Sequence, residues 1–350
     1  MIQTASRLLT QLRVIHEAIR DTVAKSGEQQ TTEQLAEVVA QQAGDTIFAI
    51  DRISEEVLIE HFTVLGQERS FVLIAEGLGE TGQMTFPAGT DPAQAELRII
   101  MDPIDGTRGI MYQKRSAWIL TGVAPNHGEQ TSLSDIEIAV QTEIPLVKQH
   151  LCDSLWAIKG EGIGGERFNR QTRERQPLIP QPSRATTIAY GYGSVSRFFP
   201  GGRAELADID DEIIYRIMGN GTPGQASVYE DQYISTGGQL YELLMGHDRW
   251  IADLRPLLAP LLHTQGHPTS LCCHPYDLCT ELIAREAGLI ITDAYEQPLN
   301  APLDVESDVT WIGYANARIH QQVAPVLQSI LSEKKLLAPA LHKSIRTLED

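Results

Sequence analysis

The chain has 350 residues, of which 42% are hydrophobic and 21% charged, a balance typical of globular proteins that fold in water. Its 28 basic and 46 acidic residues give a net charge of −18, which disfavours nonspecific binding to nucleic acid or to an anionic membrane. The sequence shows neither a run of about 18 apolar residues nor a signal-peptide core, so we expect a cytoplasmic protein. At about 150 residues per domain, the length suggests two lobes.

The N-terminal part of the chain has helical periodicity. Thr31 and Gln34 form a capping box for a helix through about Gln42, and Asp51 leads into a further helix with Glu55 one turn later. Before them, apolar residues at helical spacing predict an amphipathic helix that ends near Gly27, namely Leu8, Leu12, Ile15, Ile19 and Val23.

Two apolar runs that we interpret as strands each end in an acid. The run 70–75 ends in Glu76, and the run 98–101 ends in Asp102. Ligands gather at the carboxyl ends of strands in α/β sheets, so we predict a site there. A solvated strand end is the alternative for Glu76. Glu80 follows on a glycine-rich segment, close enough to supply a second carboxylate to this site.

The segment from Asp102 to Thr107 combines two aspartates with a turn. Pro103 fixes the chain direction, so both carboxylates and the Ile104 carbonyl can converge on one point with the oxygen ligands that Mg²⁺ prefers. Gly106 and Thr107 form a turn and a helix start, where unpaired N–H groups favour a phosphate. A polar turn that caps a helix is the alternative.

A glycine cluster follows the expected strands 116–124, 136–142 and 155–159. Gly160, Gly162 and Gly165 satisfy the G-x-G-x-x-G pattern of dinucleotide sites. That pattern needs a following helix, whereas the next residues are polar, non-periodic and end in proline. We therefore predict a hairpin, with the basic run 167–175 as a solvated loop or a weak attractor of phosphate.

Proline and polar residues at 177–182 place a boundary between lobes 1–180 and 181–335, followed by a tail at 336–350. A second α/β unit begins at 186–193, and 233–244 fits a strand followed by a helix. The segment 245–270 is expected to shape the substrate pocket.

Asp277 opens a predicted helix over 278–287, with Gly288 as its C′ residue. Capping alone is the alternative role for Asp277, and it is compatible with metal binding. Further strands are expected at 289–292 and 309–312, before a C-terminal helix capped by Asn316.

Cys272, Cys273 and Cys279 lie near His274 and Asp277, which could suggest zinc. The spacing fits no standard zinc pattern, so we expect these thiols and that of Cys152 to be reduced and mostly buried.

Three strings of the sequence resemble the inositol monophosphatase and fructose-1,6-bisphosphatase superfamily of Mg²⁺-dependent, often Li⁺-sensitive phosphatases. Residues 102–107, DPIDGT, match the first family motif in full. Glu76-Gly77 keeps one acid where the family usually has two, and Tyr276-Asp277 stands where the family has Trp-Asp. The resemblance covers about residues 8–330 and implies an αβαβα sandwich of alternating helix and sheet layers.

The resemblance also implies a metal site of two or three Mg²⁺ ions. Asp102 is the shared ligand, Glu76 and the Ile104 carbonyl hold one ion, and Asp105 and Asp277 hold another. Without cations, so many close carboxylates would repel one another.

Catalytic roles follow by the same analogy. Thr107 pairs with Asp51 to orient and deprotonate the attacking water, while Glu76 takes part as a bridging ligand. The amides of Gly106 and Thr107 hold the phosphate. Because Gly77 stands where the family has a second acid, the protein is expected to bind an auxiliary metal ion less tightly.

A phosphorylated small metabolite is the expected partner, with a homodimer as the candidate oligomer. Members of the superfamily hydrolyse inositol monophosphate, fructose 1,6-bisphosphate and 3′-phosphoadenosine 5′-phosphate. Ser270, seven residues before Asp277, and Glu242 are the candidates for substrate binding. A second hypothesis is a non-catalytic protein that binds phosphometabolites, motivated by Gly77 and the unusual Arg108.

Overall fold

The structure is a computed structural model that describes residues 2–42, 45–79, 81–222 and 224–337. Within them, an eight-stranded sheet has the order β10-β9-β8-β7-β6-β5-β3-β4, and a four-stranded sheet has the order β11-β12-β14-β13. The strands of the larger sheet are β3 (Phe71–Ala75), β4 (Gln83–Phe86), β5 (Leu97–Asp105), β6 (Ala117–Pro125), β7 (Ile138–Ile144), β8 (Leu151–Ile158), β9 (Gly162–Asn169) and β10 (Arg175–Pro177). Those of the smaller sheet are β11 (Tyr192–Val195), β12 (Asp248–Asp253), β13 (Ile290–Thr292) and β14 (Trp311–Tyr314).

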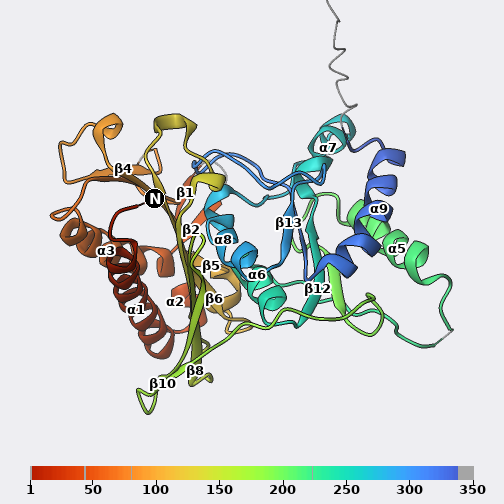
Figure 1. Cartoon of the computed structure of the whole chain (residues 1–350), viewed down its shortest axis with the longest axis horizontal. Helices are drawn as coiled ribbons and strands as arrows, with labels where there is room; N and C mark the ends of the chain where they lie inside the picture. Colours follow the sequence, from red (N-terminus) through yellow and green to blue (C-terminus); the bar gives the residue numbers. More distant parts are fainter. Residues whose placement is uncertain (1, 43–44, 80, 223, 338–350) are drawn as a thin grey trace, which may run out of the picture.

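Helices cover both faces of both sheets, which gives five alternating layers (Figure 1). Helices α1 (Ala5–Gln29) and α3 (Ala49–Leu65) cover the outer face of the larger sheet. Helices α6 (Thr236–Leu244) and α8 (Glu281–Glu286) fill the space between the sheets, and α5 (Arg203–Met218) and α9 (Ala317–Glu333) cover the outer face of the smaller one. The predicted αβαβα sandwich is confirmed.

Alternation of side chains along β12 shows why the smaller sheet is covered on both faces. Trp250 and Ala252 pack against the outer helices α5 and α9, whereas Ile251 packs toward α6 and α8 in the middle layer. Successive side chains of a strand point to opposite faces, so an apolar strand of this kind needs a helix on each side.

Two predicted helices have other bounds in the structure. The capping box of Thr31 is present, but α2 (Thr32–Leu35) lasts one turn before the chain enters β1 (Val38–Gln42), which pairs with β2 (Asp45–Phe48). The valines that begin β1 favour a strand over a longer helix. The predicted helix over 278–287 is split into a 3₁₀ helix, η5 (Pro275–Leu278), and α8.

Three other sequence predictions met different outcomes. The glycine hairpin is confirmed, because Ile158 pairs with Gly162 between β8 and β9. The basic run is partly wrong as a solvated loop, since Arg167 lies in β9 and forms an ion pair with buried Asp153. The segment before α6 is not a strand: within 233–244, the structure has only the helix.

The four cysteines are free and buried, as expected. No helix among the described residues is long and apolar enough to cross a membrane. The larger sheet ends at Pro177 and the smaller begins at Tyr192, on either side of the expected boundary near residue 180. The division into lobes 1–180 and 181–335 stays a prediction.

Gln141 of β7 ties the middle layer to the larger sheet. Its side chain is fully buried, donates to the Gly237 carbonyl of α6 at 2.7 Å and accepts from the Thr280 hydroxyl at 3.1 Å. One amide therefore holds the segments that begin both middle helices.

Gln141→Leu should lower the free energy of unfolding by about 1–3 kcal/mol, because it removes one hydrogen bond from the Gly237 carbonyl and leaves the buried Thr280 hydroxyl without this partner. Denaturant titration measures the change. Gln171→Leu, at an exposed position, is the control and should cost less than about 0.5 kcal/mol. Equal stability of both variants would show that the Gln141 bridge contributes nothing.

Candidate metal centre and phosphate pocket

A β-bulge places Asp102 and Asp105 on the same face of the larger sheet. Asp102 pairs with Leu120 and Asp105 with Trp118, so three steps along β5 match two steps along β6. In a regular strand, residues three apart point to opposite faces; one extra residue restores the same face. Strand β5 therefore continues through the turn predicted after Met101, and the bulge brings the two carboxylates together.

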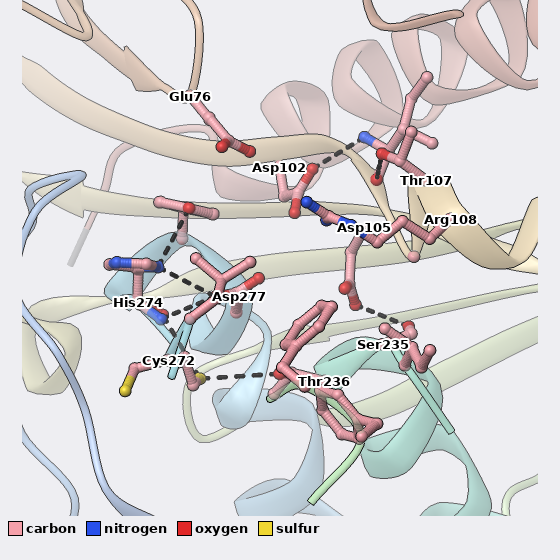
Figure 2. A pocket seen from close by; sticks show the side chains of 18 of the residues that line it. Glu76, Asp102, Asp105, Thr107, Arg108, Ser235, Thr236, Cys272, His274 and Asp277 are labelled. Atoms are coloured by element: carbon pink, nitrogen blue, oxygen red, sulfur yellow. Dashed lines mark hydrogen bonds and ion pairs between the residues drawn. The ribbon is translucent and has the colours of Figure 1, made fainter. Parts of the chain in front are cut away.

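Glu76 lies beside Asp102 because β3 and β5 are parallel neighbours. Ala75 pairs with Met101, so the residues that follow them, Glu76 and Asp102, lie next to each other where the pairing of the two strands ends. Both Glu76 and Asp102 line one pocket (Figure 2). The sequence-based expectation that these strand ends meet is confirmed, whereas their roles as ligands stay a prediction.

Asp277 reaches the pocket from η5, more than 170 positions later in the chain. Its carboxylate accepts from the backbone N–H of His274 at 2.7 Å, so it lies at the third position of the helix and not at the N-cap, which is His274. Pro275 starts the helix earlier than expected, because proline suits the first helical position.

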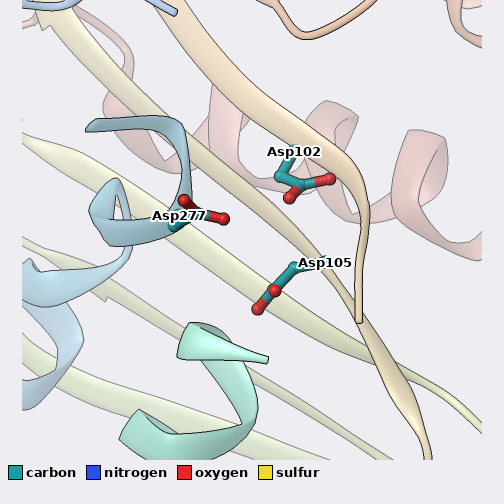
Figure 3. Close-up of side chains that lie close together, drawn as sticks. All are labelled: Asp102, Asp105 and Asp277. Atoms are coloured by element: carbon teal, nitrogen blue, oxygen red, sulfur yellow. The ribbon is translucent and has the colours of Figure 1, made fainter. Parts of the chain in front are cut away.

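The carboxylates of Asp102, Asp105 and Asp277 each offer an oxygen within 4.8 Å of the other two (Figure 3). Asp105 also accepts from the Ser235 hydroxyl at 2.8 Å and from the Gly237 N–H at 2.6 Å, which leaves its other oxygen for the pocket. The three acids thus come from β5 and from the middle layer.

Burial and mutual repulsion disfavour the charged forms of these acids. Burial, followed by the carboxylates nearby, raises the pKa of Asp102 and of Asp277 well above the ordinary value. Burial also raises the pKa of Asp105 to about 6, although its hydrogen bonds oppose the change. Because a divalent cation would remove this repulsion and oxygen ligands suit Mg²⁺, the residues present fit such an ion.

Thr107 lines the same pocket and contacts Asp51, which lies outside the lining. The Thr107 hydroxyl oxygen lies 3.1 Å from Asp51 Oδ1 and 2.8 Å from the Ile104 carbonyl oxygen. Asp51, in the first turn of α3, accepts the Phe48 N–H at 2.8 Å through its other oxygen. Gly106 precedes α4 (Thr107–Met111) with a φ of 95°, a conformation that favours glycine.

The structure places the remaining candidates elsewhere. Glu242 lines a different cavity, described below, and Ser270 is buried with its hydroxyl bonded to the Leu271 carbonyl, outside the lining of this pocket. Glu80 lies outside the described residues. Gly77 has a φ of 76°, so the turn itself favours glycine at the position where a second acid was expected.

Further residues line the pocket, among them Arg108, Phe198 and Phe199, which sequence reasoning did not assign to it. Arg255 also lines it, and it belongs to the segment 245–270 that was expected to shape the pocket. The buried Arg255 guanidinium forms an ion pair with Asp253 and lies 4.4 Å from the Phe198 ring centroid. Arg108 lies 5.1 Å from the Phe199 ring centroid. The adjacent phenylalanines stand out in the sequence, but no neighbouring residue in the sequence links them to Asp102.

The metal-free protein should lose stability as the pH rises from about 4 to 6, the interval between the ordinary and the folded pKa of Asp105. In that interval the folded state binds more protons than the unfolded state, so the slope is negative; Asp102 and Asp277 act in the same direction at higher pH. Thermal melts in chelator across this pH range measure the change in stability. Asp105→Asn should flatten the slope, and parallel curves for both proteins would contradict the assignment.

Comparison with known proteins gave matches in structure only. No protein-family model and no curated protein matches the chain. Fructose-1,6-bisphosphatase of Leishmania major in its holo form matches with a TM-score of 0.66 and 14% identity over 92% of this chain and 95% of that one. A Pyrococcus horikoshii protein described as similar to inositol-1 monophosphatase gives 0.60 and 15% over 93% and 99%. A Thermotoga maritima IMPase gives 0.55 and 16% over 93% and 99%. At these identities the likeness concerns the fold, and the chain has the fold of the inositol monophosphatase and fructose-1,6-bisphosphatase superfamily.

Proposed function

We propose that the protein is a Mg²⁺-dependent phosphatase that hydrolyses a phosphate monoester of a small metabolite. The observation that carries this proposal is the convergence of Asp102, Asp105 and Asp277 beside the Thr107 and Asp51 pair. Three buried acids without cations destabilise the fold, whereas bound metal ions would offset that cost. The hydroxyl and carboxylate pair adds what hydrolysis needs beyond binding.

Asp102 is proposed as the shared metal ligand, with Glu76 and the Ile104 carbonyl on one side and Asp105 and Asp277 on the other. When bound, Mg²⁺ would neutralise phosphate oxygens and lower the pKa of water. Two or three ions, and inhibition by Li⁺, belong to the same proposal. The pocket fits these ligands because Glu76 and Ile104 line it together with the three aspartates.

The proposed role of Thr107 is to orient the attacking water and pass its proton toward Asp51. The hydroxyl can donate to one acceptor at a time, either Asp51 or the Ile104 carbonyl. Engagement of that carbonyl by a metal would favour the bond to Asp51. The amides of Gly106 and Thr107, at the start of α4, are proposed to hold the phosphate.

The arginines and phenylalanines that line the pocket suggest how the organic part of the substrate binds. Arg108 and Arg255 supply positive charge, and Phe198 and Phe199 supply apolar surface next to them. Such a wall suits a sugar, inositol or nucleotide phosphate. Phosphate release from a panel of these esters, with and without Mg²⁺, tests both the activity and the substrate class.

A non-catalytic binding protein is the second candidate function. Arg108, directly after the first motif, is the observation that favours it, because its guanidinium lines the pocket and could hold an anion without turnover. Gly77 no longer favours it, since the positive φ gives that glycine a structural reason. Binding of every ester tested, without phosphate release, would support this candidate.

Asp102→Asn should reduce Mg²⁺-dependent hydrolysis by about 10³-fold or more, because a shared ligand loses its charge at every proposed ion. The amide oxygen can still accept the Ile104 N–H, which Asp102 accepts at 2.8 Å, so the fold should persist. Melting in chelator checks this, and the variant should be at least as stable as the wild type. A folded variant with substantial activity would remove Asp102 from the centre.

Thr107→Ala should lower kcat by about 10²-fold or more while changing the Mg²⁺ requirement little, if the hydroxyl acts in proton transfer. Thr107→Ser keeps the hydroxyl and is the matched control, which should retain most activity. Initial rates against Mg²⁺ and substrate separate the two effects. An alanine variant with the serine variant's kcat would exclude this role.

A further inference from the structure

A second cavity, of about 420 Å³, lies apart from the metal pocket and shares no lining residue with it. Its walls come from the starts of β11 and β12, from α6, from the loop before α6 and from the residues before β6. We call it the acidic cavity, because four of its lining residues are acids; the full lining is Arg115, Tyr192, Glu230, Asp231, Glu242, His247 and Asp248.

Three of the four carboxylates have a cationic partner. Glu230 forms an ion pair with Arg197, which lies outside the lining, and Asp231 forms one with Arg115. Glu242 contacts His247 and lies 3.6 Å from Arg115. These partners account for every basic group that lines the acidic cavity.

Asp248 is the exception. It is only 9% exposed, and within the described part of the chain no hydrogen bond or ion pair reaches its carboxylate. Burial, followed by the charges of Glu242 and Asp231, raises the pKa of Asp248 to about 7. Arg115 and His247 offset this rise only in part. A mostly buried acid with no hydrogen bond or ion pair of its own among the described residues, in the wall of a cavity, points to a cationic ligand.

The geometry favours an organic cation over a metal ion. Among the described residues, the side chains that converge closely enough to hold a metal are the three aspartates of the other pocket. An ammonium group needs fewer close ligands, because its three N–H donors can reach separate oxygens. Tyr192 also lines the acidic cavity, and an aromatic ring can attract a cation.

We propose that the acidic cavity binds a small aliphatic diamine or polyamine, with one ammonium group paired to Asp248 and the chain lying along Tyr192. The remaining ammonium groups face Glu242 and Asp231, which share Arg115 as an ion-pair partner. This site is separate from the proposed phosphatase centre, and its binding is measured without turnover.

The test is calorimetric titration of the full chain with spermidine, at physiological ionic strength and with saturating Mg²⁺ to occupy the other acids. The wild type should show one saturable site. Asp248→Asn should weaken binding about tenfold or more, because a charge-assisted hydrogen bond is lost. Asp211→Asn makes the same charge change at an exposed residue of α5 outside the lining, so it should stay within about threefold of the wild type. Absence of saturable binding, or equal affinities of both variants, overturns the proposal.

A second pair of variants keeps the test decisive if Asp248→Asn does not fold. Tyr192→Lys brings a tethered ammonium into the acidic cavity and should abolish spermidine binding. Tyr190→Lys changes the net charge equally at a neighbouring residue that is 67% exposed and outside the lining, so it should bind like the wild type. Retained binding in Tyr192→Lys, or equal loss in both, overturns the proposal.

Discussion

The main physical constraint at the site is the repulsion between carboxylates that the fold holds close together. The extra residue in β5 turns Asp105 to the side of Asp102, and η5 brings Asp277 against both. Burial raises the pKa of all three acids, so the metal-free protein keeps them close only because packing and hydrogen bonds elsewhere stabilise the fold. A bound cation would convert this cost into stabilisation, since it would link β5 to the middle layer.

The middle layer supplies much of the support for this arrangement. Asp105 is held by the first residues of α6, where Ser235 and Gly237 donate to it, and Gln141 holds the same segment from the sheet. A side chain at Gly237 would approach the Asp105 carboxylate to 2.9 Å, which is too close for an ordinary contact. The backbone of α6 is therefore part of the site, even though it offers no metal ligand of its own.

Local sequence was enough to predict features formed by neighbouring residues, such as the helix start at Thr107 and the acids that end β3 and β5. It also supported the layered fold through resemblance. It could not reveal the bulge after Asp102, because register depends on the partner strand. Nor could it place Phe198 and Phe199 in the pocket, or Glu242 outside it, since these positions follow from packing of segments far apart in the chain. The roles of the site residues stay predictions.

Gly122 of β6 lies beneath the segment that follows Asp277. A Cβ atom there would come within 2.6 Å of the Cys279 carbonyl oxygen, so the absence of a side chain lets η5 approach the sheet closely. The height of η5 above the sheet sets how far Asp277 lies from Asp102. Mg²⁺ binds oxygen at about 2.0–2.1 Å and Ca²⁺ at about 2.3–2.6 Å, a difference of only a few tenths of an ångström. Under the proposed function, a residue without any ligand atom would thus help to set which cation fits between Asp102 and Asp277.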